Sequence, residues 1–188
     1  MDIILKSSSP RRKELLEKMG YEFKIKVYDV DEKLDDSLSP YDNVKLLSYK
    51  KASVNQNEDY GSILIGCDTI VVLDNKIYGK PKNEKDAFDM LKKLSGKKHQ
   101  VMSGLCVIYK DKVFNDVEVS NVYFKELSDE DIFKYIETKE PFGKAGSYAI
   151  QGLGNALVAR YEGSLNNIIG LPTEMLKKIL GEINEMEN

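Results

Sequence analysis

The segment IILKSSSPRRKELLEKMGYEFKIKV, residues 3–27, decides how the chain begins. It starts with a short apolar run at residues 3–5, which predicts a buried strand. Ser9 followed by Pro10 is a typical helix start, because a serine side chain caps the first turn and proline fits its first position. The helix is expected to end near Met19, since Gly20 is a stop signal. Residues 21–27 then alternate apolar and polar side chains, which predicts a half-buried strand. The chain therefore opens as strand, turn, helix, strand.

Helices and strands keep alternating along the rest of the chain. Helices are predicted from Ser39-Pro40 onward, from Asn83 to Leu94, from Ser128 onward and from Pro172 to Leu180. Strands are predicted at residues 63–67, which end at Asp68, in a tight hairpin at 70–78, in a long hairpin at 101–124, and at 156–161. This mixture predicts an α/β or α+β fold with a mixed sheet.

Length and composition describe one globular domain. The chain has 188 residues, of which 41% are hydrophobic, and this is enough to bury an ordinary core. No repeat or linker divides it, so residues 1–188 are predicted to form a single domain. Residues 183–188 are too polar for the core and are expected to form a poorly ordered tail.

Charge and apolar patterning exclude several classes of protein. The net charge is −3, so the basic surface of a general nucleic-acid binder is absent. No apolar run has the length of a signal peptide core or a membrane helix, which predicts a soluble, cytoplasmic protein with no nucleic-acid or membrane partner. Cys67 and Cys106 lack the spacing of metal ligands, so we expect reduced thiols in the core.

The segment after the first strand collects donors for an anion. Ser7, Ser8 and Ser9 precede a helix start, and Arg11, Arg12 and Lys13 follow it directly. Hydroxyls, a helix N-terminus and guanidinium groups together suit phosphate oxygens. Cations at a helix N-terminus oppose the helix dipole, which favours an anionic partner. The alternative is a serine cap followed by a solvated basic turn.

Asp68 is a lone carboxylate in an apolar stretch, GCDTIVV at residues 66–72. An unpaired buried carboxylate costs several kcal/mol, so Asp68 is expected to be paired, bound to a metal, or exposed at the end of a strand. The alternative is a strand-ending residue that caps a turn. Lys80, held between Gly79 and Pro81, is placed to direct a cation at Asp68 or at a phosphate. The alternative for Lys80 is an ordinary surface lysine. Glu32 and Lys51, taken alone, are surface charges.

Gln151 and Gly152 lie among small residues where backbone could approach a ligand, and the Gln151 amide could pair with a base edge. The glycines do not form a dinucleotide fingerprint, because Leu157 stands where its third glycine is needed. The single histidine, His99, is expected to be an exposed residue at the start of a strand.

These segments, in this order and spacing, resemble the Maf family of nucleotide pyrophosphatases. The resemblance spans residues 3 to about 180 and is carried by SSSPRR at 7–12, DE at 31–32, KA at 51–52, GCDT at 66–69, GKP at 79–81, LSG at 94–96, KAGSYAIQG at 144–152, GS at 163–164 and GLP at 170–172. Two positions depart from the family pattern: Gly143 replaces a frequent acidic residue, and Ser103 replaces a threonine.

The resemblance implies a fold, an activity and a set of site residues. The fold would be α/β, a mixed twisted sheet with flanking helices in two lobes around a cleft, related to inosine triphosphate pyrophosphatases. The activity would be hydrolysis of a nucleoside triphosphate to the monophosphate and pyrophosphate. Asp68 would be the catalytic acid/base, and Ser7, Arg12, Lys51 and Lys80 would contact phosphates. Glu32 would join Asp68 in holding a divalent cation, Mg²⁺ or Mn²⁺.

The resemblance also narrows the substrate. Arg11, Thr69 and Gln151 match the residues that mark the family branch acting on dTTP and UTP, with modified pyrimidine triphosphates as further substrates. Family members are commonly homodimers, so a homodimer is expected. Two alternatives stay open: a broad pyrophosphatase for modified nucleotides, and a nucleotide-sensing regulator of septum formation with little turnover.

Overall fold

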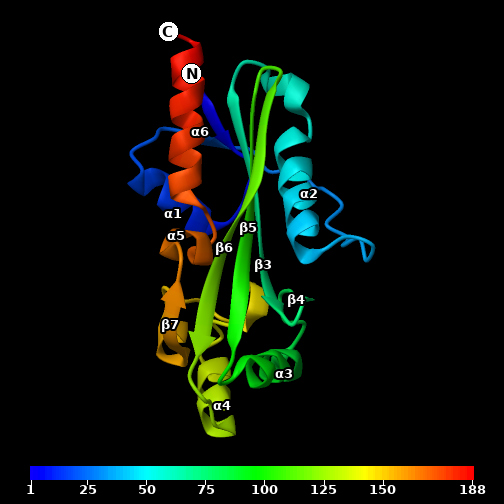
Figure 1. The fold of residues 1–188 in the computed structure, drawn as a ribbon, viewed down its shortest axis with the longest axis vertical. Helices are drawn as coiled ribbons and strands as arrows, with labels where there is room; N and C mark the ends of the chain where they lie inside the picture. The colour runs from blue at the N-terminus through cyan, green and yellow to red at the C-terminus, as the bar shows by residue number, and fades with distance from the viewer. The chain divides into compact units, whose positions relative to one another are not determined.

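The computed structural model describes all residues, Met1–Asn188, as a mixed α/β structure (Figure 1). A seven-stranded sheet has the order β2-β1-β3-β5-β6-β7, with β4 paired to β3. The elements are β1 (Ile3–Leu5), α1 (Pro10–Lys18), β2 (Lys24–Ile25), α2 (Pro40–Ser53), η1 (Gln56–Asp59), β3 (Ile63–Leu73), β4 (Lys76–Tyr78), α3 (Glu84–Leu94), β5 (Lys98–Tyr109), β6 (Lys112–Phe124), α4 (Asp129–Glu137), η2 (Ala145–Ser147), η3 (Leu153–Leu157), β7 (Val158–Glu162), α5 (Leu165–Ile169) and α6 (Thr173–Met186). The predicted α/β fold with flanking helices is confirmed.

The helix starts read from the sequence are confirmed. The side chains of Ser9, Ser39, Asn83 and Ser128 each accept a hydrogen bond from a backbone N–H in the first turn of the helix that follows. Gly20 has a φ of 82°, a left-handed conformation that ends α1. Helix α6 buries Ile183 and runs to Met186, so it takes in most of the predicted polar tail.

Two predicted strands differ from the structure. Residues 21–27 contribute only Lys24 and Ile25 to the sheet, and both are exposed. Strand β2 pairs only with β1, which itself ends at Leu5, so the ladder has no partner for a longer strand. In contrast, the strand expected to end at Asp68 continues to Leu73 as β3, because residues 70–73 are all buried.

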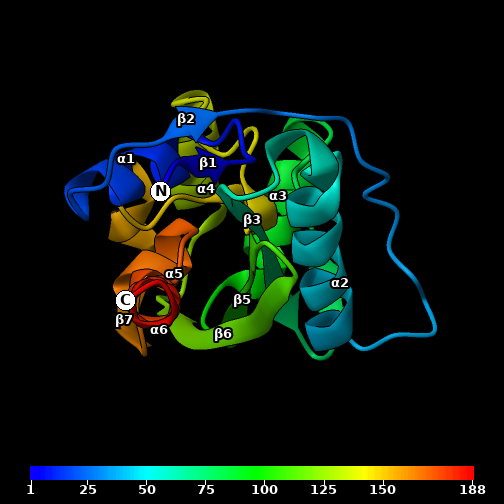
Figure 2. The same ribbon diagram turned by 90° about the horizontal axis from the view of Figure 1, so that it is seen from above.

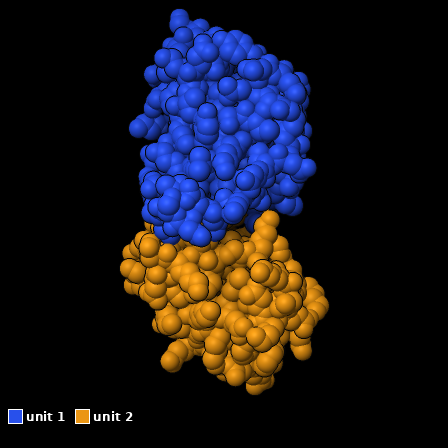
Figure 3. Space-filling view, turned by 90° about the vertical axis from the view of Figure 1, so that its right-hand side faces the viewer, with its two compact units in different colours: residues 1–68, 103–118, 170–188 blue, residues 69–102, 119–169 orange.

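The chain forms two compact units (Figure 3). The family resemblance implies two lobes. Unit 1 comprises Met1–Asp68, Ser103–Glu118 and Gly170–Asn188. Unit 2 comprises Thr69–Met102 and Val119–Ile169. Strands β3, β5 and β6 each contribute residues to both units.

Unit 1 is built by packing α2 closely onto the sheet. Helix α2 and helix α6 lie on opposite sides of β3 and β5 (Figures 1 and 2). Ala52 of α2 joins a buried cluster with Leu64 and Cys106 from the strands. A Cβ atom at Gly66 would lie 2.5 Å from the carbonyl oxygen of Ser48, and Gly104 on β5 likewise has no room for one. Glycine at both positions therefore lets the helix backbone rest directly on the strands.

Unit 2 has its own core, into which α3, α4 and strand residues pack. His99 lies in this unit and is only 1% exposed, so the prediction of an exposed histidine is wrong. Its ring contacts Phe124 and Tyr148 edge-on, and Nε2 lies 2.7 Å from the Tyr148 hydroxyl. Burial lowers the pKa of His99 to about 4, so the ring is neutral at pH 7. The aromatic partners come from distant segments, which is why local sequence did not reveal the burial.

The two cysteines are free and buried, as predicted. The helices are all too short or too polar to span a lipid bilayer.

Candidate active site

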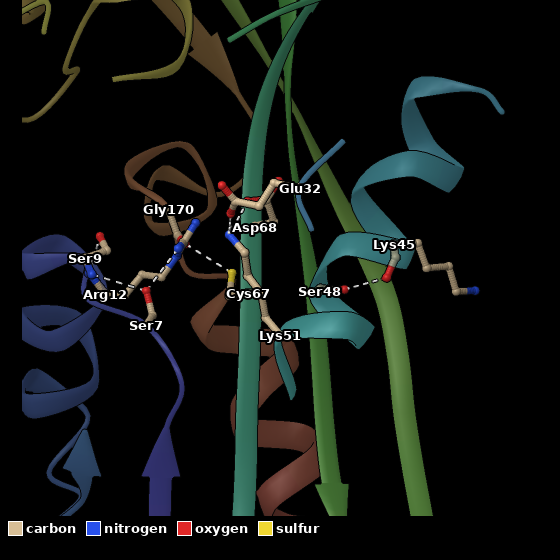
Figure 4. Close-up of polar contacts among 10 residues, drawn as sticks. All are labelled: Ser7, Ser9, Arg12, Glu32, Lys45, Ser48, Lys51, Cys67, Asp68 and Gly170. Carbon is tan, nitrogen blue, oxygen red and sulfur yellow. Dashed lines mark hydrogen bonds and ion pairs between the residues drawn. The ribbon is translucent and has the colours of Figure 1, made fainter. Parts of the chain in front are cut away.

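Lys51, Asp68 and Glu32 form one cluster in unit 1 (Figure 4). The Lys51 ammonium lies 2.7 Å from Oδ1 of Asp68 and 2.5 Å from Oε1 of Glu32. The side chains of Lys51 and Asp68 are each 16% exposed, whereas Glu32 is 57% exposed. Asp68 is therefore a paired, largely buried carboxylate in the middle of a strand, one of the situations that the sequence predicted.

The cluster follows from how α2 sits on β3. Lys51 is in the last turn of α2 and directly precedes Ala52, which is fully buried against the sheet. Because Gly66 lets that turn approach β3 closely, the Lys51 side chain reaches Asp68 two residues further along the strand. Burial by itself lowers the pKa of Lys51, but the charge of Asp68 and the hydrogen bonds that Lys51 donates to Asp68 and Glu32 outweigh it and raise the pKa. Lys51 therefore carries its positive charge at pH 7.

Ser7 and Arg12 form a second cluster in unit 1, at the start of α1. Arg12 donates from Nε to the carbonyl oxygen of Gly170 at 2.8 Å and from Nη1 to the hydroxyl oxygen of Ser7 at 3.1 Å (Figure 4). The backbone N–H of Ser9 also donates to the Ser7 hydroxyl at 3.2 Å. These two acceptors orient the guanidinium group, which suits it to bind a phosphate.

The carbonyl of Gly170 links this cluster to strand β3. It accepts both from Arg12 and from the Cys67 thiol, whose sulfur lies 3.3 Å away. Cys67 is fully buried and directly precedes Asp68. The sequence did not reveal this contact, because Cys67 and Gly170 are 103 residues apart and neither carries a pattern that pairs them.

Arg11 is half-buried beside Arg12, unlike a fully solvated basic turn. Burial, together with the neighbouring charge of Arg12, lowers the pKa of Arg11. Two adjacent guanidinium groups at a helix N-terminus repel each other and oppose the dipole, and an anion bound there would relieve both effects.

Thr69, Lys80 and Gln151 belong to unit 2. Thr69 follows Asp68 directly in β3 and is half-buried. Lys80 and Gln151 are exposed. The loop that carries Lys80 meets the loop that precedes Gln151, because the N–H of Gly146 donates to the carbonyl of Gly79 at 3.1 Å. Unit 2 thus brings the Lys80 segment to the KAGSYAIQG segment.

The carboxylates of Glu32 and Asp68 suit a divalent cation. Both reach the same lysine nitrogen, so they converge on one point that already holds a positive charge. No group of three or more His, Cys, Asp or Glu side chains is arranged so that it could hold a metal ion by itself. Mg²⁺ typically uses one or two carboxylates, with water and substrate phosphates completing its shell. The pair therefore fits a cation that binds together with a phosphorylated substrate.

Comparisons with known proteins cover nearly the whole chain. A family model described as "Maf-like protein" matches residues 2–183. A protein of Caldicellulosiruptor bescii named dTTP/UTP pyrophosphatase is 46% identical over 187 residues, covering 96% of this chain and 94% of the relative. One of the same name from Alkaliphilus oremlandii is 48% identical over 181 residues, covering 95% and 94%. The solved structure of a HAM1 protein from Coxiella burnetii matches with a TM-score of 0.50 over 97% of this chain and 99% of that one, at 13% identity, which is a likeness of fold.

Proposed function

The chain belongs to the Maf family, and from that premise we propose that it is a nucleoside triphosphate pyrophosphatase that hydrolyses dTTP and UTP to the monophosphate and pyrophosphate. Relatives that share nearly half of its residues over almost its full length carry that name. The observation in the structure that supports the proposal most is the contact of Lys51 with both Asp68 and Glu32 in unit 1. This contact brings together a carboxylate that can activate water and a cation that can bind phosphate oxygens.

We assign the role of general base to Asp68. A water molecule attacks the α-phosphorus in line, the new P–O bond forms, and the bond to the β-phosphate oxygen breaks. The carboxylate of Asp68 orients this water and takes its proton, while pyrophosphate leaves with the bonding electron pair. Because Lys51 keeps its charge, its ammonium holds the Asp68 carboxylate in one orientation and offers positive charge to the phosphates.

Ser7, Arg12 and Lys80 are the further phosphate contacts in this proposal. Ser7 and Arg12 are oriented by hydrogen bonds within unit 1, so little ordering is needed when a phosphate binds. Lys80 is an exposed cation, and Pro81 directly after it restricts its backbone.

Glu32 and Asp68 would hold a divalent cation, Mg²⁺ or Mn²⁺. Such an ion would neutralise phosphate charge and lower the pKa of bound water. Its proposed ligands belong to the same cluster as Lys51, so binding requires the lysine to share or leave the two carboxylates.

Base selection is assigned to Arg11, Thr69 and Gln151. A glutamine amide carries both a donor and an acceptor, which is what the edge of uracil or thymine can pair with.

We further propose that the protein is a cytoplasmic homodimer. Sedimentation of the pure protein tests the dimer.

Release of pyrophosphate by the pure protein tests the function. We expect dTTP and UTP to be hydrolysed in preference to purine triphosphates, and a chelator to abolish turnover. The products separate this reaction from phosphatase chemistry, because UTP must yield UMP and pyrophosphate. A protein that binds UTP without turning it over would instead be a nucleotide-sensing regulator.

A further inference from the structure

We propose that Glu140 is a positioning residue that fixes the segment carrying Gln151 and thereby sets the preference for pyrimidine bases. The inference deepens the proposed function and rests on it, because it takes Gln151 as the residue that contacts the base. Glu140 lies in unit 2, just beyond the end of α4, and belongs to none of the clusters described above.

Both carboxylate oxygens of Glu140 bind the backbone that follows Gln151. Oε1 accepts from the N–H of Leu153 at 2.9 Å, and Oε2 accepts from the N–H of Gly154 at 2.8 Å. These N–H groups open η3 and would otherwise have no partner within that short helix. A carboxylate that accepts two such bonds fixes both the distance and the angle of the segment.

Gly152 shows how closely the carboxylate approaches. A Cβ atom at this position would lie 2.8 Å from Cδ of Glu140 and would overlap its Oε1. The φ of Gly152 is −107°, a value open to any residue, so a larger residue here would be opposed by the Glu140 carboxylate, which would have to move out of its place. The turn between Gln151 and η3 is closed around the Glu140 side chain.

The other side of Gln151 is tethered as well. The N–H of Ala149 donates to the Tyr135 hydroxyl at 3.1 Å, and Ile150 is 3% exposed. Burial, followed by a hydrogen bond to the Glu140 side chain, raises the pKa of Tyr135, so its hydroxyl stays protonated. Gln151 is exposed between two anchored points, of which Glu140 holds the one that follows it.

Glu140 is itself held in place. Its N–H donates to Oγ1 of Thr138 at 3.2 Å, and its carbonyl accepts from Nζ of Lys144 at 2.7 Å. An isosteric amide at position 140 could accept only one of the two N–H bonds, because its NH₂ group would face the other donor. Glu140→Gln therefore keeps the size of the side chain and loosens the segment.

The kinetic test compares UTP with GTP in wild type, Glu140→Gln, Gln151→Ala and the double variant. We expect Glu140→Gln to lower the ratio of kcat/KM for UTP over GTP by about tenfold, which is the value of one hydrogen bond, through KM and with little change in kcat. In the Gln151→Ala background the same change should have no further effect on the ratio. Glu137→Gln, an exposed residue of α4, is the matched control and should match wild type. An unchanged ratio in Glu140→Gln, or an equal loss in both backgrounds, overturns the proposal.

Hydrogen exchange separates the two possible failures. The amides of Leu153 and Gly154 should exchange faster in Glu140→Gln than in wild type, while amides of β3 are unchanged. This measurement needs no turnover. If wild type hydrolyses neither UTP nor dTTP, the proposed function fails, and unchanged exchange at Leu153 and Gly154 independently overturns the role of Glu140.

Discussion

The ammonium of Lys51 lies 2.7 Å from Oδ1 of Asp68, and each of the two side chains is 16% exposed. Such a largely buried ion pair depends on both partners, because a single charge left in this position is poorly solvated. Replacing Lys51 with methionine keeps the length of the side chain and removes the charge. We expect kcat/KM for UTP to fall by roughly 10².

A control comes from the same helix. The Lys45 side chain points away from the pair in Figure 4, so Lys45→Met should retain activity. Equal activity of Lys51→Met and wild type would show that the ammonium has no role in the reaction.

Gly66 is predicted to be essential for this geometry. In Gly66→Ala the new methyl group would meet backbone atoms of Ser48 and Ala52, so α2 must move away from β3. We expect a loss of roughly 1–3 kcal/mol in the free energy of unfolding and a weakened Lys51–Asp68 contact. Gly181→Ala in α6 meets nothing within 4 Å and should be neutral or slightly stabilising. Denaturant melts of both variants test this, and equal stability would contradict the close packing of α2.

His99 predicts how stability depends on pH. Its pKa is about 4 in the folded protein and 6.5 when unfolded, so protons favour the unfolded chain. The contribution of neutral His99 to the free energy of unfolding is complete above pH 6.5. About 3 kcal/mol of it is lost as the pH falls toward 4. The non-titrating variant His99→Gln should show a smaller loss between pH 7 and pH 4. Parallel acid dependence of the two proteins would mean that His99 titrates normally.

We predict that Arg12 acts through the planar guanidinium group, which carries several N–H donors. Arg12→Lys keeps the charge but cannot donate at once to the Gly170 carbonyl, the Ser7 hydroxyl and a phosphate. We expect kcat/KM for UTP to fall by about tenfold or more, which is the loss of one charge-assisted hydrogen bond. Lys13→Met removes an exposed cation one residue further along α1 and should have little effect. A matching loss in both variants would indicate a general effect of charge.

The sequence predicted the parts of the fold that local chemistry determines. Capping serines, Pro10 and the stop signal at Gly20 each act within one turn, and the structure contains all of them. Asp68 was expected at a strand end because a carboxylate usually interrupts an apolar run, yet here Lys51 satisfies the charge and the strand continues.

The contacts that orient the site could not be predicted from local sequence patterns. Lys51 meets Glu32 and Asp68 only because α2 packs against β3, and no spacing along the chain encodes that approach. The same holds for the Gly170 carbonyl, which accepts from Cys67 and Arg12 across long sequence separations. The resemblance to a family identified these residues as a set, but only the structure shows how they are arranged in space.

The most direct test of the account is the rate at which Asp68→Asn releases UMP and pyrophosphate from UTP, compared with wild type. The substitution keeps the shape of the side chain and removes its charge and basicity. We expect UMP and pyrophosphate in equal amounts from wild type, and a rate lower by roughly 10² or more in the variant. Near-normal release by Asp68→Asn, or UDP and phosphate as the products of wild type, would contradict it.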